Sequence, residues 1–198
     1  YAILFKKAPV AVSTGDTPTD TSAQTNLLIY PFFQATHLMV VLGFAMLLTF
    51  IHRHRLTTMV TCLWVGCLSA QFYFFWNAVW MLVFTGTVHP ITLDHLANGE
   101  FAAASILIAV CAVIGKASNY QYFVMTMLFM PAYALNEYVV LDWFDAKDVG
   151  GSMVIHAFGA CFGLAVAFHL KYPNGDNTNK NLHPSQTSFT TALVGTTL

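Results

Sequence analysis

The chain has 198 residues, of which 57% are hydrophobic and only 9% are charged, and its formal net charge is −1. Soluble domains average about 25% charged residues, so this composition excludes an ordinary water-soluble globular protein. The small net charge also argues against a nucleic-acid-binding surface. The composition instead predicts a polytopic membrane protein, an all-α bundle of transmembrane helices in contact with a lipid bilayer.

Five apolar runs are long enough to cross the hydrocarbon layer of a membrane, and a sixth begins near the end of the chain. The predicted spans are residues 32–51, 58–84, 101–117, 120–140 and 149–170, with an incomplete span at 189–198. Residues 1–31 are polar after an apolar start at Tyr1–Phe5, and they predict a loop that follows the remnant of an earlier span. We interpret both ends as internal to a longer membrane protein, of which residues 32–198 form a partial membrane domain.

Basic residues in the short loops predict the orientation of the bundle. With five crossings, five of them fall on one side, which the positive-inside rule makes cytoplasmic: Arg53, Arg55, Lys116, Lys171 and Lys180. Loops 52–57, 116–119 and 171–188 are then cytoplasmic, and residues 1–31 are extracellular, with the cell membrane as the expected location. The opposite side collects carboxylates that would concentrate cations at an opening: Asp94, Glu100, Asp142, Asp145 and Asp148.

An imidazole lies in the middle of the fifth apolar run. Asp148 is a good N-cap residue, so a helix is expected to begin near it. His156 then lies roughly 10 to 12 Å along the helix from that start, near the middle of a hydrocarbon layer about 30 Å thick. An ionisable group at this depth is costly, so it indicates a pathway or a binding site.

Two interpretations stay open for the face that carries this histidine. Four residues share the face on an α-helix because they are spaced by four, three and four positions: Ser152, His156, Gly159 and Gly163. The face is either a pore wall or a close-packed helix contact in which the histidine bonds to a neighbour. Glu137 is likewise either a carboxylate that attracts cations into a vestibule or a charge at the membrane interface. From its position in the sequence alone, Phe101 is expected to be an ordinary aromatic side chain of the helix core.

A haem-binding electron carrier is a second class of function that the histidines allow. His156 and His169 are thirteen residues apart on one predicted helix, and a partner pair would have to come from His37 and His52, fifteen apart. The four cysteines fall inside apolar runs, which is typical of small buried side chains rather than of a disulfide or zinc site. We therefore expect no metal and no cofactor.

The stretch Asp148–Leu164, with the sequence DVGGSMVIHAFGACFGL, resembles the signature of the Rh (Rhesus) glycoprotein branch of the ammonium transporter superfamily. Shorter pieces are similar to segments of the family in the same order, among them Tyr30–Gln34, Phe101–Ser105 and Asn136–Tyr138. The resemblance extends from Tyr30 to Leu198. The ammonium transporters proper carry a tryptophan near the end of the fourth span, and its absence from Ala132–Tyr138 favours the Rh branch.

The resemblance implies the first half of an eleven- or twelve-helix fold that assembles as a homotrimer or an Rh heterotrimer. Each subunit of the family has a narrow hydrophobic pore, with two aromatic rings at its outer mouth and two hydrogen-bonded histidines at its middle. By position, His156 matches the first histidine, Phe101 one gate ring and Glu137 an acidic vestibule residue. The second histidine and the second ring belong to later helices, outside this chain.

Ser152, which shares a helix face with His156 by its spacing, is predicted to line the pore with it, and Asp148, Gly150 and Gly151 form the predicted signature turn. The resemblance implies a membrane channel, not an enzyme, which recruits ammonium, deprotonates it at the outer mouth and passes neutral ammonia along the pore. Ammonia, methylamine and carbon dioxide stay open as substrates. A non-transporting structural member of the Rh family is the alternative.

Overall fold

The computed structural model describes residues 29–50, 55–88, 91–170 and 185–198, and over these residues it is helical without any strand. This confirms the all-α class. Two parts of the prediction lie outside the described residues. They are the loop before residue 29 and three of the basic residues used for orientation, Arg53, Lys171 and Lys180.

The described helices are numbered in chain order. The first, helix 29–50 (Ile29–Phe50), contains a π-helical turn, η1, then α3, then a 3₁₀ turn, η2. Their bounds are η1 Met39–Gly43, α3 Phe44–Leu47 and η2 Leu48–Phe50, and after them come α4 Arg55–Thr85, α5 Leu93–Cys111, α6 Asn119–Glu137, η4 Tyr138–Trp143, η5 Val149–Gly151, η6 Ser152–Ala157, α7 Phe158–His169 and α8 Gln186–Thr197.

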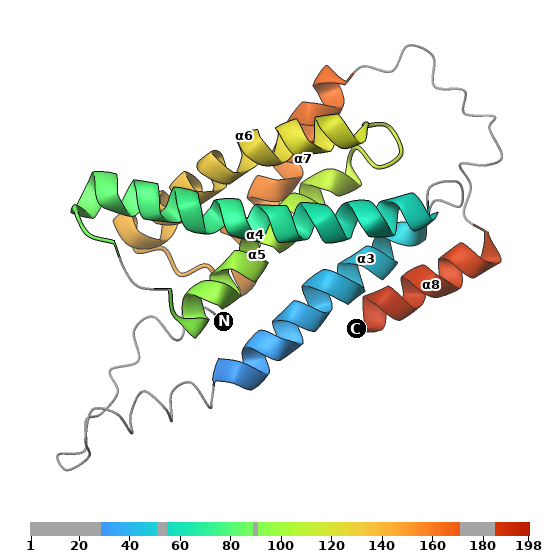
Figure 1. Ribbon diagram of the computed structural model, residues 1–198, viewed down its shortest axis with the longest axis horizontal. Helices are drawn as coiled ribbons and strands as arrows, with labels where there is room; N and C mark the ends of the chain where they lie inside the picture. Colours follow the sequence, from blue (N-terminus) through green and yellow to red (C-terminus); the bar gives the residue numbers. More distant parts are fainter. Residues whose placement is uncertain (1–28, 51–54, 89–90, 171–184) are drawn as a thin grey trace.

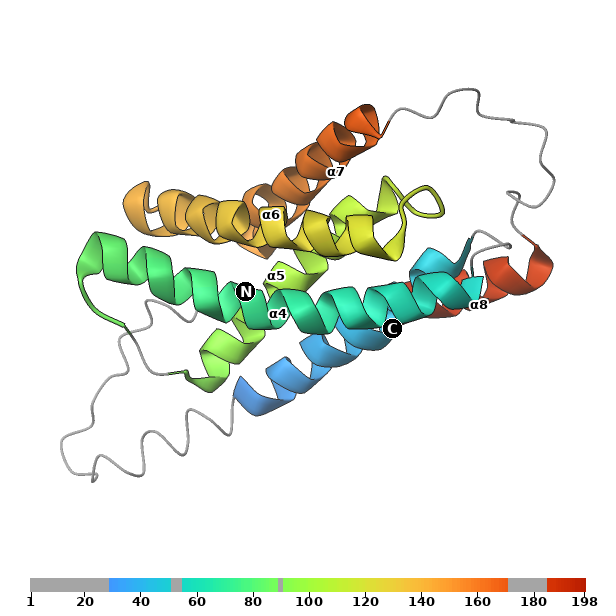
Figure 2. The same cartoon turned by 45° about the horizontal axis from the view of Figure 1, so that its top comes forward.

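The long helix α4 crosses the middle of the bundle (Figure 1). Helix 29–50 and α8 lie together on one side of it, and α6 and α7 lie on the other, an arrangement that Figure 2 shows again after rotation. Helix α5 contacts α4, α6 and α7, so it lies at the centre of the packing. The packing of α5 therefore positions α4, α6 and α7 relative to one another.

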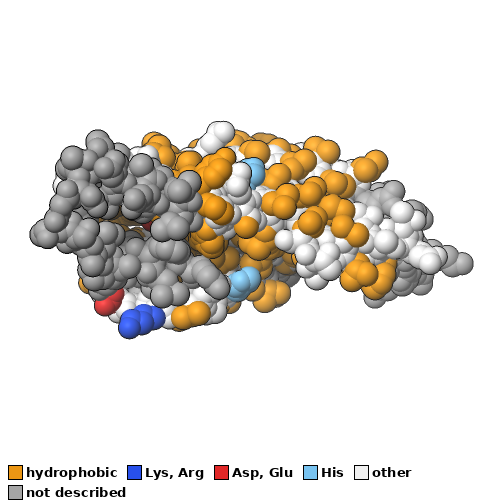
Figure 3. All heavy atoms as spheres, turned by 90° about the horizontal axis from the view of Figure 1, so that it is seen from below, with side chains coloured by type: hydrophobic (Ala, Val, Ile, Leu, Met, Phe, Trp, Pro, Cys, Tyr) orange, Lys and Arg blue, Asp and Glu red, His pale blue; other side chains and the backbone are white. Residues whose placement is uncertain are grey.

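Four of the described helices are long and apolar enough to cross a membrane: Ile29–Phe50, Leu56–Thr85, Asn119–Trp143 and Val149–His169. On the face shown in Figure 3, hydrophobic side chains cover much of the described surface, and the charged side chains in view lie towards one end. Such a surface favours lipid or another apolar helix as its surroundings.

Helix α5 begins at Leu93, whereas the sequence predicted a loop up to Glu100 and a span from Phe101. Thr92 caps this start, because its hydroxyl accepts a hydrogen bond from the backbone N–H of His95 at 3.4 Å. Gly99, which lies between the predicted spans 58–84 and 101–117, permits close contact with α4, since a Cβ there would lie 2.7 Å from the ring of Phe74. The polar first half of α5 is thus helical and packed.

The contact between α5 and α7 is a backbone contact. A Cβ atom on Gly163 would lie 2.7 Å from the carbonyl oxygen of Ala109, and one on Gly159 would lie 2.5 Å from that of Ser105. The hydroxyl of Ser105 also donates to the carbonyl of Ile155 at 2.9 Å. The small residues at the start of the predicted third span are buried, as expected for a close helix contact.

A tight turn precedes α7, and one carboxylate closes it. Gly150 and Gly151 have φ angles of 75° and 69°, a left-handed conformation that glycine adopts without steric cost. The buried carboxylate of Asp148 accepts hydrogen bonds from the N–H of Met153 at 3.0 Å and of Val154 at 2.9 Å. It also accepts one from the hydroxyl of Ser152 at 2.7 Å. Asp148 therefore satisfies donors that a helix start leaves unpaired.

The same bonds determine the protonation of this carboxyl group. Burial opposes ionisation of Asp148, but the hydrogen bonds from Val154, Met153 and Ser152 outweigh it and hold the pKa below its usual range. A carboxyl whose pKa is lower when folded stabilises the protein above its unfolded pKa, and this contribution is lost as the pH falls through the folded pKa.

We predict that Gly163→Ala lowers the free energy of unfolding in detergent by about 1–3 kcal/mol, because a methyl group would overlap the backbone of α5. The measurement is the unfolding midpoint in a denaturant series. Gly66→Ala in α4 is the control, since a Cβ there meets nothing within 4 Å. Equal midpoints for the two variants would contradict the close contact.

We predict that Asp148→Asn lowers the free energy of unfolding by about 1–3 kcal/mol at pH 7, because the amide replaces an acceptor with a donor that faces backbone N–H groups. The gap to the wild type should shrink below about pH 4, where the Asp148 carboxyl of the unfolded chain begins to take up a proton, and it should vanish as the pH falls through the lowered pKa of the folded state. Asp145→Asn, at an exposed position, serves as the control. A gap that stays constant down to pH 3 would contradict the ionised cap.

Candidate functional site

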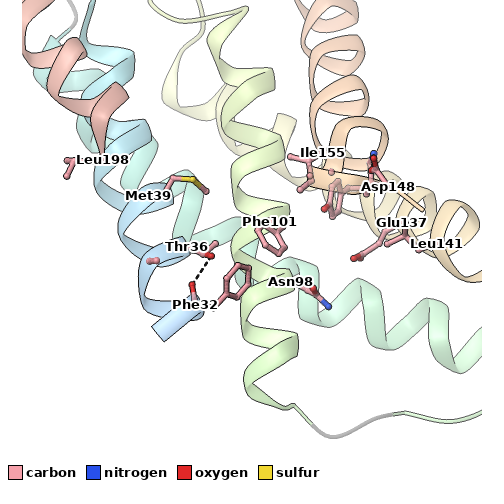
Figure 4. Close-up of a pocket in the computed structure, with 15 residues that line it drawn as sticks. Phe32, Thr36, Met39, Asn98, Phe101, Glu137, Leu141, Asp148, Ile155 and Leu198 are labelled. Carbon is pink, nitrogen blue, oxygen red and sulfur yellow. Dashed lines mark hydrogen bonds between the residues drawn. The ribbon is translucent and has the colours of Figure 1, made fainter. Parts of the chain in front are cut away.

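A pocket of about 390 Å³ opens at the end of the bundle where α5 begins. Its walls come from helix 29–50, α5, α6 with η4, and the turn before α7 (Figure 4). It is lined by Phe32, Ala35, Thr36, Met39, Asn98, Phe101, Tyr133, Glu137, Leu141, Asp148, Gly150, Gly151, Val154, Ile155 and Leu198. The pocket thus brings together five of the seven residues predicted from the sequence, from three separate spans.

Phe101 lies in the pocket beside a second ring. Its centroid is 6.2 Å from that of Phe32, with a tilt of 56° between the planes. The two rings are drawn side by side in Figure 4. Phe32 and Phe101 belong to helices that are far apart in sequence, so the pair depends on the packing of helix 29–50 against α5.

A hydrogen bond between side chains joins those two helices next to the rings. His37 Nδ1 lies 2.8 Å from Glu100 Oε1, and the His37 ring stacks on Phe33 with centroids 5.8 Å apart. Glu100 directly precedes Phe101 in α5. The pair therefore ties helix 29–50 to α5 at the level of the aromatic rings.

Glu137 is half-buried in the pocket wall and has a specific partner. The hydroxyl of Tyr73, from α4, donates a hydrogen bond to Glu137 Oε2 at 2.7 Å. In Figure 4 the carboxylate points from α6 towards the side on which Asn98 and Phe101 lie. Of the two interpretations of Glu137, this geometry favours a carboxylate that faces a pocket over a charge that reaches out to the membrane interface.

Asp148, Gly150 and Gly151 line the same pocket, and Figure 4 shows Asp148 across it from the phenylalanine pair. Because the carboxylate of Asp148 is occupied by Ser152, Met153 and Val154, its evident task is to hold the turn. The signature turn thus forms part of the wall while fixing the start of the histidine helix.

Ser152 and His156 lie outside this pocket and are exposed. Gly159 and Gly163, by contrast, are buried against α5. The predicted single face is therefore divided, because Ser152–Ala157 forms a π-helical segment with i→i+5 bonds, which changes the angular spacing from that of an α-helix. The glycines make the close helix contact, and the histidine ring lies on a side that the described residues leave open.

Three residues of the site were not predicted from the sequence. Tyr133 lies four residues before Glu137, and the i, i+4 spacing of a helix would have placed it in the same wall. Phe32 opens the first apolar run, but nothing in the sequence indicated that it meets Phe101. Tyr73 gave no signal, because it is one of several aromatic residues in α4.

The described residues contain no cluster of three or more histidine, cysteine, aspartate or glutamate side chains that could hold a metal ion. Of the histidines considered for haem, His169 is exposed and its Nδ1 lies 2.8 Å from the Ala165 carbonyl of its own helix. His52 lies outside the described residues.

Known proteins resemble this chain over most of its length. A model described as the Ammonium Transporter Family matches residues 3–198. The ammonium transporter Rh type C of Bos taurus is 35% identical over 167 residues, which cover 84% of this chain and 36% of the relative. The ammonium transporter Rh type A of Canis lupus familiaris is 36% identical over 173 residues, which cover 84% of this chain and 40% of the relative. The chain thus spans about two fifths of the length of these curated relatives.

The fold is also found in a solved structure, that of Rh50 from Nitrosomonas europaea, which is described as one of the Rhesus protein family of channels. It aligns with a TM-score of 0.73 at 27% sequence identity, covering 87% of this chain and 46% of that chain. Together with the apolar helices, these matches show a multi-pass membrane protein of Rh type. The chain belongs to the ammonium transporter family, whose members are transporters rather than enzymes.

Proposed function

We propose that the complete protein is a membrane channel for neutral ammonia, with ammonium recruited and deprotonated at the outer mouth. The observation that carries the proposal is the pocket in which the Glu137 carboxylate faces the rings of Phe32 and Phe101. Such a pocket offers a negative charge and aromatic faces, both of which attract a small cation. Relatives named as ammonium transporters add support.

The energetics favour transfer of the neutral molecule. Moving a bare cation into an apolar channel carries a Born penalty that one imidazole does not offset. Ammonium has a pKa of about 9, so the release of its proton at neutral pH costs only about 3 kcal/mol. Deprotonation at the mouth followed by passage of ammonia is therefore the less costly route, and carbon dioxide, also uncharged, is a further candidate.

Each site residue then has a distinct task. Glu137 raises the local concentration of ammonium, and Phe101 with Phe32 excludes hydrated ions. His156, with Ser152 on the same π-helical segment, forms hydrogen bonds to ammonia that has lost its water. The pocket faces the extracellular side of the cell membrane, and the Ala112–Ser118 connection faces the cytoplasm. The complete protein assembles as a trimer.

We predict that His156→Ala lowers ammonia flux about five- to tenfold in proteoliposomes, because one hydrogen bond to the desolvated substrate is lost. Stopped-flow measurement of internal pH after an ammonium gradient gives the flux. His169→Ala is the matched control, since this exposed histidine contacts a carbonyl of its own helix. Unchanged flux in His156→Ala with trimers intact would contradict the role and favour a non-transporting family member.

We predict that Glu137→Gln raises the methylammonium concentration for half-maximal flux about three- to tenfold, because the charge that concentrates the cation is lost. The difference from the wild type should shrink as the ionic strength rises. Asp142→Asn is the control, since Asp142 is exposed in η4 and lies outside the pocket lining. The same change in both variants would indicate a general surface-charge effect instead of recruitment by Glu137.

A further inference from the structure

The partner of Glu137 is a buried phenol from another helix. Tyr73 lies in α4, is 1% exposed and is not among the residues that line the pocket. Its hydroxyl donates to Glu137 Oε2 at 2.7 Å, so the bond reaches the carboxylate from behind the pocket wall. One oxygen of Glu137 is therefore held from the protein interior while the carboxylate lines the pocket.

Packing fixes the direction of this hydroxyl. The Tyr73 ring lies edge-on to Tyr133, with centroids 6.1 Å apart, and edge-on to Phe74, with centroids 5.7 Å apart. Phe74 is itself held against Gly99 of α5. The phenol is thus enclosed by side chains of α4 and α6 and has no room to swing away from Glu137.

The hydrogen-bond partners of Tyr73 also orient its proton. The side-chain amide of Asn77 lies one turn further along α4, and its Nδ2 donates to the Tyr73 hydroxyl at 3.5 Å. An oxygen that accepts from Asn77 directs its own hydrogen towards the carboxylate. Asn77, Tyr73 and Glu137 thus form a chain of two hydrogen bonds, and the shorter bond ends at the carboxylate.

A carboxylate in an apolar wall needs such a donor. Charge-assisted hydrogen bonds are stronger than neutral ones, and they restrict the rotation of the group that accepts them. A fixed Oε2 also fixes the orientation of the Glu137 carboxylate relative to the rings of Phe101 and Phe32. Without the bond, Glu137 loses a contact that restricts its rotamers, and the position of its charge is less well defined.

We propose that Tyr73 is a positioning residue for cation recognition: by holding Glu137, it sets the affinity of the pocket for ammonium and small alkylammonium ions. This inference rests on the proposed recruitment role of Glu137. Tyr73 does not touch the cation, and it acts only through the carboxylate. A purely structural phenol, filling the contact between α4 and α6, would change stability without changing cation affinity.

The test is Tyr73→Phe in the complete protein, reconstituted in liposomes and assayed by methylammonium flux. The ring is retained and only the hydroxyl is lost. We expect the concentration for half-maximal flux to rise about three- to tenfold while the maximal flux stays unchanged. In the double variant with Glu137→Gln, removal of the hydroxyl should add less than about twofold, since its charged partner is already absent.

Tyr122→Phe is the matched control. Tyr122 is also a buried tyrosine, but its hydroxyl donates to the backbone carbonyl of Val113 at 3.1 Å, away from Glu137. We expect this variant to lower the unfolding midpoint and to leave the half-maximal concentration unchanged. It measures what loss of a buried phenolic hydrogen bond does when no cation site is involved.

The outcomes distinguish recruitment of the cation by Glu137 from positioning of Glu137 by Tyr73. If Glu137→Gln weakens methylammonium affinity and Tyr73→Phe does not, the positioning role is wrong and the recruitment role stands. If Tyr73→Phe has its full effect in both backgrounds, the phenol acts independently of Glu137 and the inference is overturned. If Glu137→Gln itself changes nothing, recruitment by Glu137 fails and the positioning role fails with it.

Discussion

The close approach of α7 to α5 is the contact on which the rest of the structure depends. Gly159 and Gly163 have no side chains, so the backbone of α7 lies against the carbonyl oxygens of Ser105 and Ala109. In a membrane, helices associate through such packing and hydrogen bonds, because lipid is as apolar as their side chains. The contact sets the distance between the helical segment η6–α7, which follows the Asp148 turn, and the first half of α5, which carries Phe101. The width of the pocket follows from it.

Each carboxylate discussed at the pocket end of the bundle has a hydrogen-bond partner within the protein. Glu137 accepts from Tyr73, Glu100 meets His37, and Asp148 accepts from the turn before α7. Unpaired charges are expensive in an apolar setting, so each pair lets a carboxylate remain where its charge is useful. Each pair also joins two segments, and two of the three join different helices. The charges therefore define the geometry of the pocket while they supply its negative potential.

Hydropathy and the spacing of rare polar residues were enough to predict the helical class and the importance of the signature stretch. The sequence was less informative where the start of a helix or the face of a side chain depends on helix packing or on a change of helix type. The stretch before Phe101 was predicted to lie outside the spans, but it forms the first half of α5, where Gly99 packs closely against Phe74 of α4. Ser152 and His156 were predicted to share a face with Gly159, but the π-helical turn changes the angular spacing. The hydrogen bond from Tyr73 to Glu137 joins two residues that are 64 positions apart in the sequence, so no local pattern could indicate it.

Under the proposed function, the division of the predicted face places recruitment and conduction at different sites. Ile155 lines the pocket, while the next residue, His156, is exposed on a different side of the helix. A cation held by Glu137 therefore does not meet the imidazole in the same cavity, and the proton can leave ammonium before the neutral molecule reaches His156. Loss of Glu137 should then alter how the rate depends on cation concentration, whereas loss of His156 should alter the rate at saturation. Two sites that act in series on different forms of one substrate would explain why the pocket is charged and aromatic while the histidine segment is flanked by apolar residues.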